Sequence, residues 1–356
     1  MKSELYCHIT EEAEALRIAL ANRKENMAAL GRKYAGVKRI FVVGSGTSCH
    51  AGLSMKREME KLAGCEVTAL FPSAFREMVN LPAEGALCLG VSQSGRSAVT
   101  VKALERCREL GYFTCAVSSN KPSPLADAAE DYIPLEVGLE ASATTKGYVA
   151  SMLTLLLLAL EIGLANGHAT AAQEAEIVSD MEGHIARLPG LIEACEAWVT
   201  ENREELLQAE RMSVLGYEAN YGTAMEGALK LLEAVRVMVA GYDFEEWLHG
   251  GYNALSEKSY LFLCASPSRG DYRQRLDKVV EVIRPYTPHI YVIGGQGPDR
   301  RTCRADFSGK EWLAPYEYIL PFQMMIALLP EMKGINADRV LIPTFHAAVG
   351  SKVFNT

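Results

Sequence analysis

Residues 38–48 read KRIFVVGSGTS, and this stretch decides the fold because it joins a buried strand to a helix. The run from Lys38 to Gly44 is short and apolar, which is typical of a strand buried on both faces. Gly44 and Gly46 allow a tight turn after this run, and residues 48–62 follow as a predicted helix. Strand, turn and helix in this order predict one unit of a parallel α/β sheet.

The same alternation continues through the first half of the chain. Residues 11–31 carry apolar side chains at helical intervals and predict an N-terminal helix. The uncharged run 147–160 is shorter than the roughly 20 residues of a membrane-spanning helix, so we expect a buried core helix there. The other elements predicted in this half are strands at 67–71, 86–91, 112–117 and 132–135 and a helix at 98–110.

The second half repeats the pattern. The strand RMSVLG at 211–216 mirrors RIFVVG at 39–44, so the chain is predicted to be a tandem repeat of one α/β unit. The elements predicted here are a helical connector at 171–208, helices at 224–239 and 321–329, and strands at 260–265 and 290–294. We therefore expect an N-terminal helix (1–33), a first domain (34–170), the connector (171–208), a second domain (209–340) and a C-terminal tail (341–356). Each domain is expected to hold a parallel sheet with helices on both faces.

Length, charge and composition restrict the possible functions. A chain of 356 residues is long for one hydrophobic core, which favours two domains. The net charge is -8 and the basic residues are scattered, so we expect no nucleic-acid or membrane partner. The polar N-terminus lacks the basic start and apolar stretch of a signal peptide, which predicts a cytoplasmic protein. The nine cysteines form no C-x-x-C pair and are expected to be reduced packing residues, and the seven histidines lack metal-binding spacing.

The turn G-S-G-T-S lies where the first strand becomes a helix. Such a turn leaves backbone N–H groups free at a helix N-terminus, which favours an anion beside Gly46, Thr47 and Ser48. The alternative is an ordinary capped turn with Thr47 or Ser48 as the N-cap. The sequence does not match the G-x-G-x-x-G dinucleotide fingerprint.

A second polar loop follows the strand 86–91. Ser92, Gln93, Ser94 and Ser97 offer hydroxyl and amide donors at the start of another helix. Loops at the carboxyl ends of neighbouring parallel strands converge on one crevice, so together they predict a phosphate site. The alternative is ordinary serine-rich turn chemistry.

A threonine and a lysine stand just before the apolar core helix. Thr144 and Lys146 open this segment, and Lys146 opposes the helix macrodipole at that place. Either a neighbouring carboxylate or a ligand would account for the lysine.

The second repeat carries a row of charges and a histidine. Glu226, Lys230 and Glu233 stand at i, i+4 and i+7 and share one helical face among apolar neighbours. The alternative is an exposed salt-bridge ladder, but buried charge is expensive unless it is paired or used. His249 follows in a glycine-rich loop, and a glutamate and a histidine together can supply a base and an acid near neutral pH. A structural histidine is the alternative.

These motifs together resemble one known family. G-S-G-T-S, S-Q-S-G-R-S, T-K before an apolar helix, and E-G-A-L-K-L-L-E followed by a histidine are similar to those of the tandem sugar isomerase (SIS) family. That family includes the isomerase half of glucosamine-6-phosphate synthase and the fructosamine-6-phosphate deglycases. The resemblance covers essentially the whole chain and implies two flavodoxin-like three-layer sandwiches.

The resemblance also implies roles for individual residues. Glu233 matches the base that moves a proton between C1 and C2, His249 matches the residue that opens the sugar ring, and Lys230 matches another active-site lysine. In the family the histidine comes from the neighbouring subunit, which implies a homodimer or higher oligomer with a shared active site. The substrate-binding residues implied are Gly46, Thr47, Ser48, Ser92, Gln93, Ser94, Ser97, Thr144, Glu226 and, in the tail, Lys352.

Two positions depart from the family pattern, namely Arg96, where an acidic residue is frequent, and Phe345-His346-Ala347 in the tail. A glutaminase domain is not expected, because the isomerase-like region starts within a few dozen residues of Met1. The leading hypothesis is a deglycase that splits a 6-phosphorylated fructosamine into a hexose 6-phosphate and an amine, without metal or other cofactor. The alternatives are an aldose-ketose isomerase, an amino-sugar-phosphate deaminase, and a non-catalytic sugar-phosphate sensor.

Overall fold

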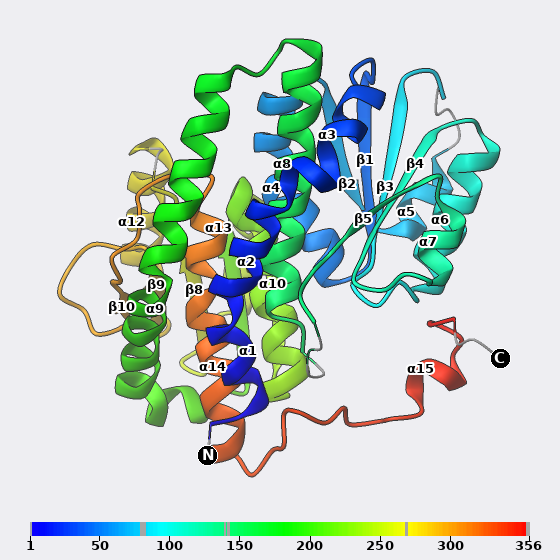
Figure 1. Cartoon of the computed structure of the whole chain (residues 1–356). Coiled ribbons are helices and arrows are strands. Elements are labelled where there is room, and N and C mark those ends of the chain that lie inside the picture. Colours follow the sequence, from blue (N-terminus) through cyan, green and yellow to red (C-terminus); the bar gives the residue numbers. More distant parts are fainter. Residues whose placement is uncertain (1, 79–82, 139, 141–142, 268–269, 354–356) are drawn as a thin grey trace. The chain divides into compact units, whose positions relative to one another are not determined.

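The chain forms two compact units in a computed structural model that describes residues 2–78, 83–138, 140, 143–267 and 270–353 (Figure 1). We call them the first-sheet unit and the second-sheet unit, after the sheet that each contains. The first-sheet unit comprises Glu14–Glu140, Lys146–Glu182 and Leu341–Thr356, and the second-sheet unit comprises Met1–Ala13, Ala141–Thr145 and Gly183–Val340. Residues 354–356 of the predicted tail lie outside the described residues.

The first-sheet unit is built on five parallel strands in the order β2-β1-β3-β4-β5. This is the order of a flavodoxin-like sheet, in which ligands bind where the strand order reverses. The strands are β1 (Arg39–Gly44), β2 (Glu66–Leu70), β3 (Ala86–Val91), β4 (Phe113–Ser118) and β5 (Asp131–Pro134).

Helices cover both faces of this first sheet. The helix α4 (Thr47–Ala63) packs on β1 and β2, and α8 (Lys146–Asn166) packs on α4. On the opposite face Phe41, Val43 and Cys88 form a core with α5 (Pro72–Glu77), α6 (Ala98–Glu109) and α7 (Pro124–Ala128). The alternation of side chains along β1 places these two sets of contacts on opposite faces. Figure 1 shows α6 and α7 on one side of the strands and α4 on the other.

The predicted core helix is α8, which is uncharged along most of its length. By length and composition it could cross a membrane, but 89% of its most apolar window is buried inside the fold. Its buried residues run from Lys146 to Gly163. It is therefore the core helix that the sequence predicts.

The second-sheet unit repeats the topology of the first. Its parallel strands lie in the order β10-β9-β8-β6-β7, which is the same order as in the first sheet when read from β7. The prediction of a tandem repeat with parallel sheets is thus confirmed. The strands are β6 (Arg211–Gly216), β7 (Met238–Asp243), β8 (Ser259–Cys264), β9 (His289–Ile293) and β10 (Thr302–Cys303).

Helices also flank the second sheet on both faces. The helix α10 (Ala219–Lys230) packs on β6 and β7, and Phe322 of α14 (Leu320–Met332) contacts Phe262 of β8. Leu215, Trp247 and Leu276 belong to the core on the other face. Further helices of this unit are α1 (Glu4–Thr10), α11 (Phe244–Trp247), the 3-10 helix η2 (Gly251–Ala254), α12 (Gly270–Ile283) and α13 (Ala314–Tyr318).

The long helix α9 (Ala171–Leu207) covers the segment that was predicted to be a helical connector. Its residues up to Glu182 belong to the first-sheet unit, and those from Gly183 belong to the second-sheet unit. The tail contains one short helix, α15 (Phe345–Ala348).

Two predicted helices are wrong in extent. Residues 11–31 form parts of two helices, α2 (Glu12–Ala21) and α3 (Arg23–Lys33). The helix is interrupted at Asn22, because the backbone of this residue lies outside helical geometry. The helix predicted at 224–239 begins earlier and ends at Val235, because Arg236 adopts a left-handed conformation and the next residues enter β7. Seven of the nine cysteines are buried and all nine are free thiols, as predicted for packing residues.

Candidate active site

The first glycine-rich turn has a conformation that requires glycine. Gly46 is the N-cap of α4, with φ 55° and ψ -128°, a region that side chains rarely adopt. A Cβ on Gly44 would lie 2.6 Å from the Cβ of Ser48, so this position also excludes a side chain. No side-chain hydrogen bond caps the helix, and therefore the alternative of an ordinary capped turn with Thr47 or Ser48 as the N-cap is wrong. Thr47 and Ser48 instead lie in the first turn, at the positive end of the helix.

The serine loop, which we define as residues 92–97, lies beside this turn. Gly44 and Val91 are paired in register at the ends of β1 and β3, so both loops leave neighbouring strands at the same edge. Ser92 is buried, and its N–H donates to the carbonyl of Val117 at 3.1 Å. The structure thus brings together the two loops that were predicted to form the phosphate site.

A third loop, after β4, holds the serine loop in place. The N–H of Ser119 donates to the Gln93 carbonyl at 2.8 Å, and Asn120 Nδ2 donates to the Ser94 carbonyl at 3.3 Å. The N–H of Leu125 donates to the Gly95 carbonyl at 3.0 Å. The main chain of the serine loop is therefore fixed by tertiary hydrogen bonds that the sequence did not indicate.

The serine loop ends at the N-terminus of α6. Ser97 is the N-cap, but its side chain makes no capping hydrogen bond, and its Oγ accepts one from Thr100 Oγ1 at 2.9 Å. Helices α4 and α6 thus start at the ends of neighbouring strands, on the same edge of the sheet, without side-chain caps. Backbone N–H groups at such helix starts are suited to bind an anion.

The tail pairs with the serine loop. Ser97 and Lys352 form an isolated antiparallel bridge, the N–H of Ala98 donates to Ser351 O at 3.1 Å, and the N–H of Val353 donates to Arg96 O at 2.8 Å. Next to this bridge His346 Nδ1 lies 2.7 Å from Ser351 Oγ. Partial burial and then the charge of Lys352 lower the pKa of His346. Lys352 and Ser97 are therefore neighbours within one unit.

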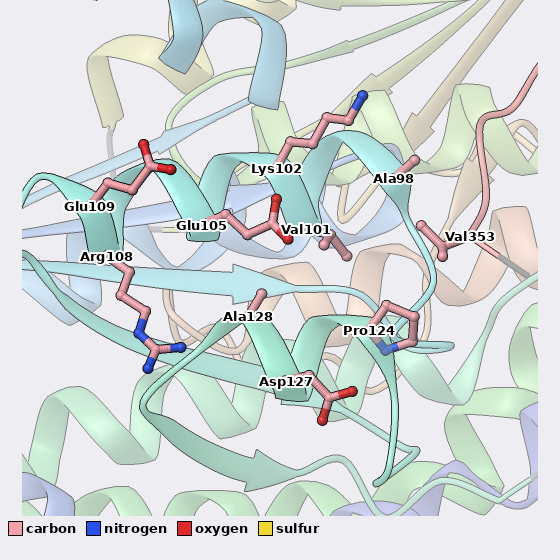
Figure 2. A pocket seen from close by; sticks show the side chains of 10 residues that line it. All are labelled: Ala98, Val101, Lys102, Glu105, Arg108, Glu109, Pro124, Asp127, Ala128 and Val353. Carbon is pink, nitrogen blue, oxygen red and sulfur yellow. The ribbon is translucent and has the colours of Figure 1, made fainter. Parts of the chain in front are cut away.

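A surface groove of about 760 Å³ runs along α6 and α7, with Val353 of the tail at one end beside Ala98 and Pro124 (Figure 2). Its charged side chains have both signs and include Lys102, Glu105 and Asp127. None of the predicted site residues lines it, so it is separate from the two loops described above.

Glu140 is a residue of this region that the sequence analysis missed. Its Oε2 accepts a hydrogen bond from Gln93 Nε2 and another from the Gly147 N–H, the latter at 3.0 Å. Lys146 is the first residue of α8 and is buried, and Thr144 precedes it in an irregular segment. The only sequence signal for Glu140 was an acidic residue shortly before a helix start, where the macrodipole favours a carboxylate.

The charged row of the second-sheet unit is an ion-paired cluster. Lys230 Nζ lies 2.6 Å from Glu233 Oε2 and 3.4 Å from Glu226 Oε1. The side chains of Lys230 and Glu226 are 2% and 1% exposed, so the alternative of an exposed ladder is wrong for these two. Burial by itself would lower the pKa of Lys230, but the charges of Glu226 and Glu233 raise it above its ordinary value. The lysine therefore stays an ammonium ion at neutral pH.

Glu233 differs from the other two members of the cluster. It lies in a π-helical turn, η1 (Leu231–Val235), that directly follows α10. Turns of this kind are rare and are frequent at functional sites. Its side chain is 38% exposed while one carboxylate oxygen is held by Lys230. The geometry presents a carboxylate that is held in place by Lys230 to the solvent, as a general base requires.

His249 lies in the same unit, in a turn after α11. Its backbone N–H donates to Glu246 O at 3.1 Å, and the residue is exposed. Among the described side chains no hydrogen bond or ion pair joins His249 to the cluster of Glu226, Lys230 and Glu233. The structure thus assembles the glutamate-lysine cluster and leaves the histidine at the surface. In the described ranges no three His, Cys, Asp or Glu side chains are grouped as for a metal ion.

Comparison with known proteins identifies relatives over most of the chain. The SIS domain family matches residues 33–161. Glutamine-fructose-6-phosphate aminotransferase (isomerizing) of Pseudomonas putida is 28% identical over 315 residues, which are 86% of this chain and 51% of that protein. The chain therefore spans about half the length of the curated relatives that it matches.

Two solved structures agree with this relationship. A "putative phosphosugar isomerase" from Clostridium difficile 630 is 26% identical, with a TM-score of 0.92 over the whole of both chains. A "putative sugar binding protein" from Salmonella typhimurium LT2 is 30% identical, with a TM-score of 0.80 over 91% of this chain and 100% of that one.

Proposed function

The chain belongs to the SIS domain family, and on that premise we propose that it is a deglycase acting on a 6-phosphorylated fructosamine. The proposed products are a hexose 6-phosphate and a free amine. The observation that carries the proposal is the carboxylate of Glu233, half-exposed in a π-helical turn and held at 2.6 Å by the buried Lys230.

The first-sheet unit is proposed to anchor the phosphate. Two helices start there at the ends of neighbouring strands without side-chain caps, next to the hydroxyls of Thr47, Ser48 and Ser94. Backbone N–H groups and hydroxyls can hold a phosphate monoester without a basic cluster, which fits the acidic net charge of the chain. Lys352, paired with Ser97, is proposed to add a positive charge beside the same loop.

The second-sheet unit is proposed to perform the chemistry. Glu233 takes a proton from C1 of the ketosamine and returns it to C2, while the C1 amine nitrogen gives up its N–H proton and the C2 carbonyl oxygen gains one and becomes a hydroxyl. The product of this shift is an imine between C1 and the amine. Water then adds to C1, the C–N bond breaks, and the aldose 6-phosphate and the amine are released. Lys230 fixes the position of the base by a charge-assisted hydrogen bond.

His249 is proposed to open the sugar ring in the active site of a second copy of the chain. His249 is exposed, so its imidazole ring is accessible to a second copy of the chain. In this proposal the protein is a homodimer or a higher oligomer, and neither a metal nor another cofactor takes part.

Other reactions would use the same base. An aldose-ketose isomerase or an amino-sugar-phosphate deaminase also needs a carboxylate that moves a proton between C1 and C2. A non-catalytic sugar-phosphate sensor would need the phosphate site alone. A paired carboxylate that is exposed to solvent favours an enzyme over a sensor.

One set of assays separates these functions. The purified protein is incubated with fructoselysine 6-phosphate, glucosamine 6-phosphate or fructose 6-phosphate, and glucose 6-phosphate, free amine and ammonia are measured. The proposal expects glucose 6-phosphate and lysine from the first substrate. Ammonia from glucosamine 6-phosphate alone would replace the deglycase with a deaminase, and binding without turnover of all three would indicate a sensor.

A further inference from the structure

The π-helical turn that carries Glu233 ends at a residue with an unusual backbone. Arg236 is the C-cap of η1, with φ 59° and ψ 45°, which is the left-handed region that favours glycine. Its N–H closes the turn by donating to the carbonyl of Leu231 at 3.0 Å. The left-handed conformation of Arg236 is therefore part of the turn that presents the proposed base.

The side chain of Arg236 reaches another segment of the second-sheet unit. Its Nη2 donates to the carbonyl of Arg339 at 2.8 Å and to the carbonyl of Asn336 at 3.3 Å. The segment 336–339 follows α14 and forms a local turn, in which the Asp338 N–H donates to Asn336 Oδ1 at 3.0 Å. One guanidinium thus connects the end of η1 to a turn with ordered carbonyls. We call its two hydrogen bonds to these carbonyls the arginine clamp.

The arginine clamp accounts for a left-handed residue that is not glycine. Such a residue persists only where the surrounding structure enforces its conformation. Hydrogen bonds from a charged donor are stronger than those from a neutral donor, so the clamp can offset the cost of the conformation. At the end of α4 the corresponding residue is Gly64, with φ 69°, whose N–H donates to the carbonyl of Glu60. An arginine at this place adds hydrogen bonds that a glycine cannot make.

The shape of η1 sets the direction of Glu233 relative to Lys230. An α-turn has about 3.6 residues and i→i−4 bonds, whereas a π-turn closes over five residues and advances each residue by a smaller angle. If Arg236 relaxed to a right-handed conformation, its N–H bond to Leu231 would break and the turn could tighten. Glu233 would then rotate about the helix axis, away from its present bond of 2.6 Å to Lys230. A misplacement of about 1 Å can cost about 100-fold in rate.

We propose that Arg236 is a positioning residue, and that the arginine clamp holds the π-turn in the shape that directs Glu233 at the substrate. This inference rests on the proposed function, because it takes Glu233 as the base. Arg236 acts through the main chain of η1. Its loss should therefore slow proton transfer and leave phosphate binding by the first-sheet unit unchanged.

The first test separates kcat from KM. Both are measured for the phosphorylated fructosamine, together with binding of glucose 6-phosphate, in wild type, Arg236→Ala and Arg236→Lys. We expect Arg236→Ala to lower kcat by about 10- to 100-fold, with KM and glucose 6-phosphate binding within about twofold of wild type. Arg236→Lys keeps a charged donor and should recover part of kcat. A loss confined to KM, unchanged kcat in Arg236→Ala, or equal losses of kcat in the two variants would overturn the inference.

Two further variants exclude a general effect on folding. Arg236→Gly suits the left-handed backbone, so it should resist urea better than Arg236→Ala and still lose kcat, because the arginine clamp is gone. Full activity of Arg236→Gly would overturn the inference, since the backbone conformation alone would then be sufficient. Arg284→Ala removes an exposed arginine whose surface ion pair with Asp299 has a distance of 3.8 Å, and it should behave like wild type. An equal loss of kcat in Arg284→Ala would also overturn the inference.

Hydrogen exchange tests the arginine clamp without a substrate. The amides of Arg236 and Asp338 are hydrogen bonded, and in Arg236→Ala the segments 231–236 and 336–339 should exchange at least about 10-fold faster than in wild type. Unchanged exchange in both segments would overturn the inference, whatever the activity. If exchange changes as expected but the wild type turns over none of the substrates, the proposed function fails, and with it the role of Glu233 as the base.

Discussion

The helix after β1 and the helix after β6 follow the same backbone course with different residues. Both span 17 residues, α4 in one piece and α10 as 12 residues followed by the five of η1. The N-cap angles are φ 55° and ψ -128° at Gly46, and φ 52° and ψ -127° at Glu218. Each helix ends at a left-handed residue, Gly64 in the first and Arg236 in the second. The duplicated backbone has therefore been kept at both ends of the helix.

The second repeat has kept this backbone without the glycines. Glu218 and Arg236 are the two non-glycine residues with positive φ in the described part of the chain. Such conformations cost about 1–3 kcal/mol each and persist where the surrounding structure enforces them. Arg236 also donates hydrogen bonds to the carbonyls of Asn336 and Arg339. In this pair of helices the backbone geometry has outlasted the glycines that suit it best.

The two helices differ most in how deeply their charged side chains are buried. The first helix has hydroxyls in its first turn, at Thr47 and Ser48, and its ion pair of Glu58 and Lys61 lies at the surface, with Lys61 50% exposed. The second helix has its charges in its last turns, and there Lys230 is 2% exposed. We propose that the first repeat binds the substrate and that the second repeat transforms it.

The largest expected effect comes from Glu233→Gln. This variant keeps the shape of the side chain but removes the base, so turnover of the phosphorylated fructosamine should fall by at least about 1,000-fold. Binding of glucose 6-phosphate should stay within about twofold of wild type. Initial rates and calorimetry measure the two quantities. Glu58→Gln on the first helix is the matched control and should leave turnover unchanged; retention of activity by Glu233→Gln would contradict the assignment.

The next largest effect concerns stability and Lys230. Replacing it by Met removes the positive charge that is paired with the buried Glu226, which should lower the free energy of unfolding by about 3–5 kcal/mol. Adding Glu226→Gln should recover part of this loss, because the buried negative charge is then gone. Lys61→Met, which breaks the surface pair on the first helix, should cost less than about 1 kcal/mol. Urea unfolding measures all three, and equal losses for Lys61→Met and Lys230→Met would contradict the difference in burial.

The pH dependence of the Lys230 effect follows from the direction of its pKa shift. The pKa of Lys230 is raised in the folded state, in spite of its burial, by Glu226 and Glu233. A raised lysine pKa stabilises the fold at every pH below the ordinary value of about 10.4, and this stabilisation is lost as pH rises further. The stability difference between wild type and Lys230→Met should therefore be constant from pH 6 to 9 and should shrink above pH 10.4. If this stability difference is already lost at a pH below 9, that would contradict the stabilisation of the fold by the ion pairs of Lys230 with Glu226 and Glu233.

A smaller effect is expected at the start of the first helix. Gly46→Ala forces a Cβ into a conformation that it rarely adopts, which should destabilise the protein by about 1–3 kcal/mol. The same change disturbs the N–H groups at the helix start and should weaken binding of glucose 6-phosphate. Thermal unfolding and calorimetry measure the two effects. Unchanged binding in a folded variant would argue against this turn as part of the phosphate site.

The smallest effect is the reciprocal change in the second helix. Glu218→Gly relieves backbone strain, but the added freedom of the unfolded chain offsets part of the gain. We expect an increase in the free energy of unfolding of up to about 1 kcal/mol and no change in phosphate binding. Destabilisation by this variant would show that contacts of the glutamate outweigh the strain.

Local sequence was sufficient for the first strand, turn and helix, because each is specified by residues close together in the chain. It was insufficient at the end of α10, since Arg236 carries no sign of its left-handed conformation and Val237 and Val239 continue an apolar pattern. In the site, Gly46 and the serine loop were identifiable from the residues themselves. The contact of Glu140 with Gln93 is tertiary, so no local pattern could indicate it.

The tail pairs with the serine loop, so the phosphate binding that we propose there would be thermodynamically linked to tail docking. The N–H of Ala98, at the start of α6, is bonded to Ser351, so a phosphate bound at that helix start either reinforces the tail contact or competes with it. In both cases ligand concentration changes how often the tail detaches. The exposed segment 341–350 precedes this contact, next to Arg339, where trypsin can cleave. The rate of tryptic cleavage there would consequently serve as a label-free measure of site occupancy.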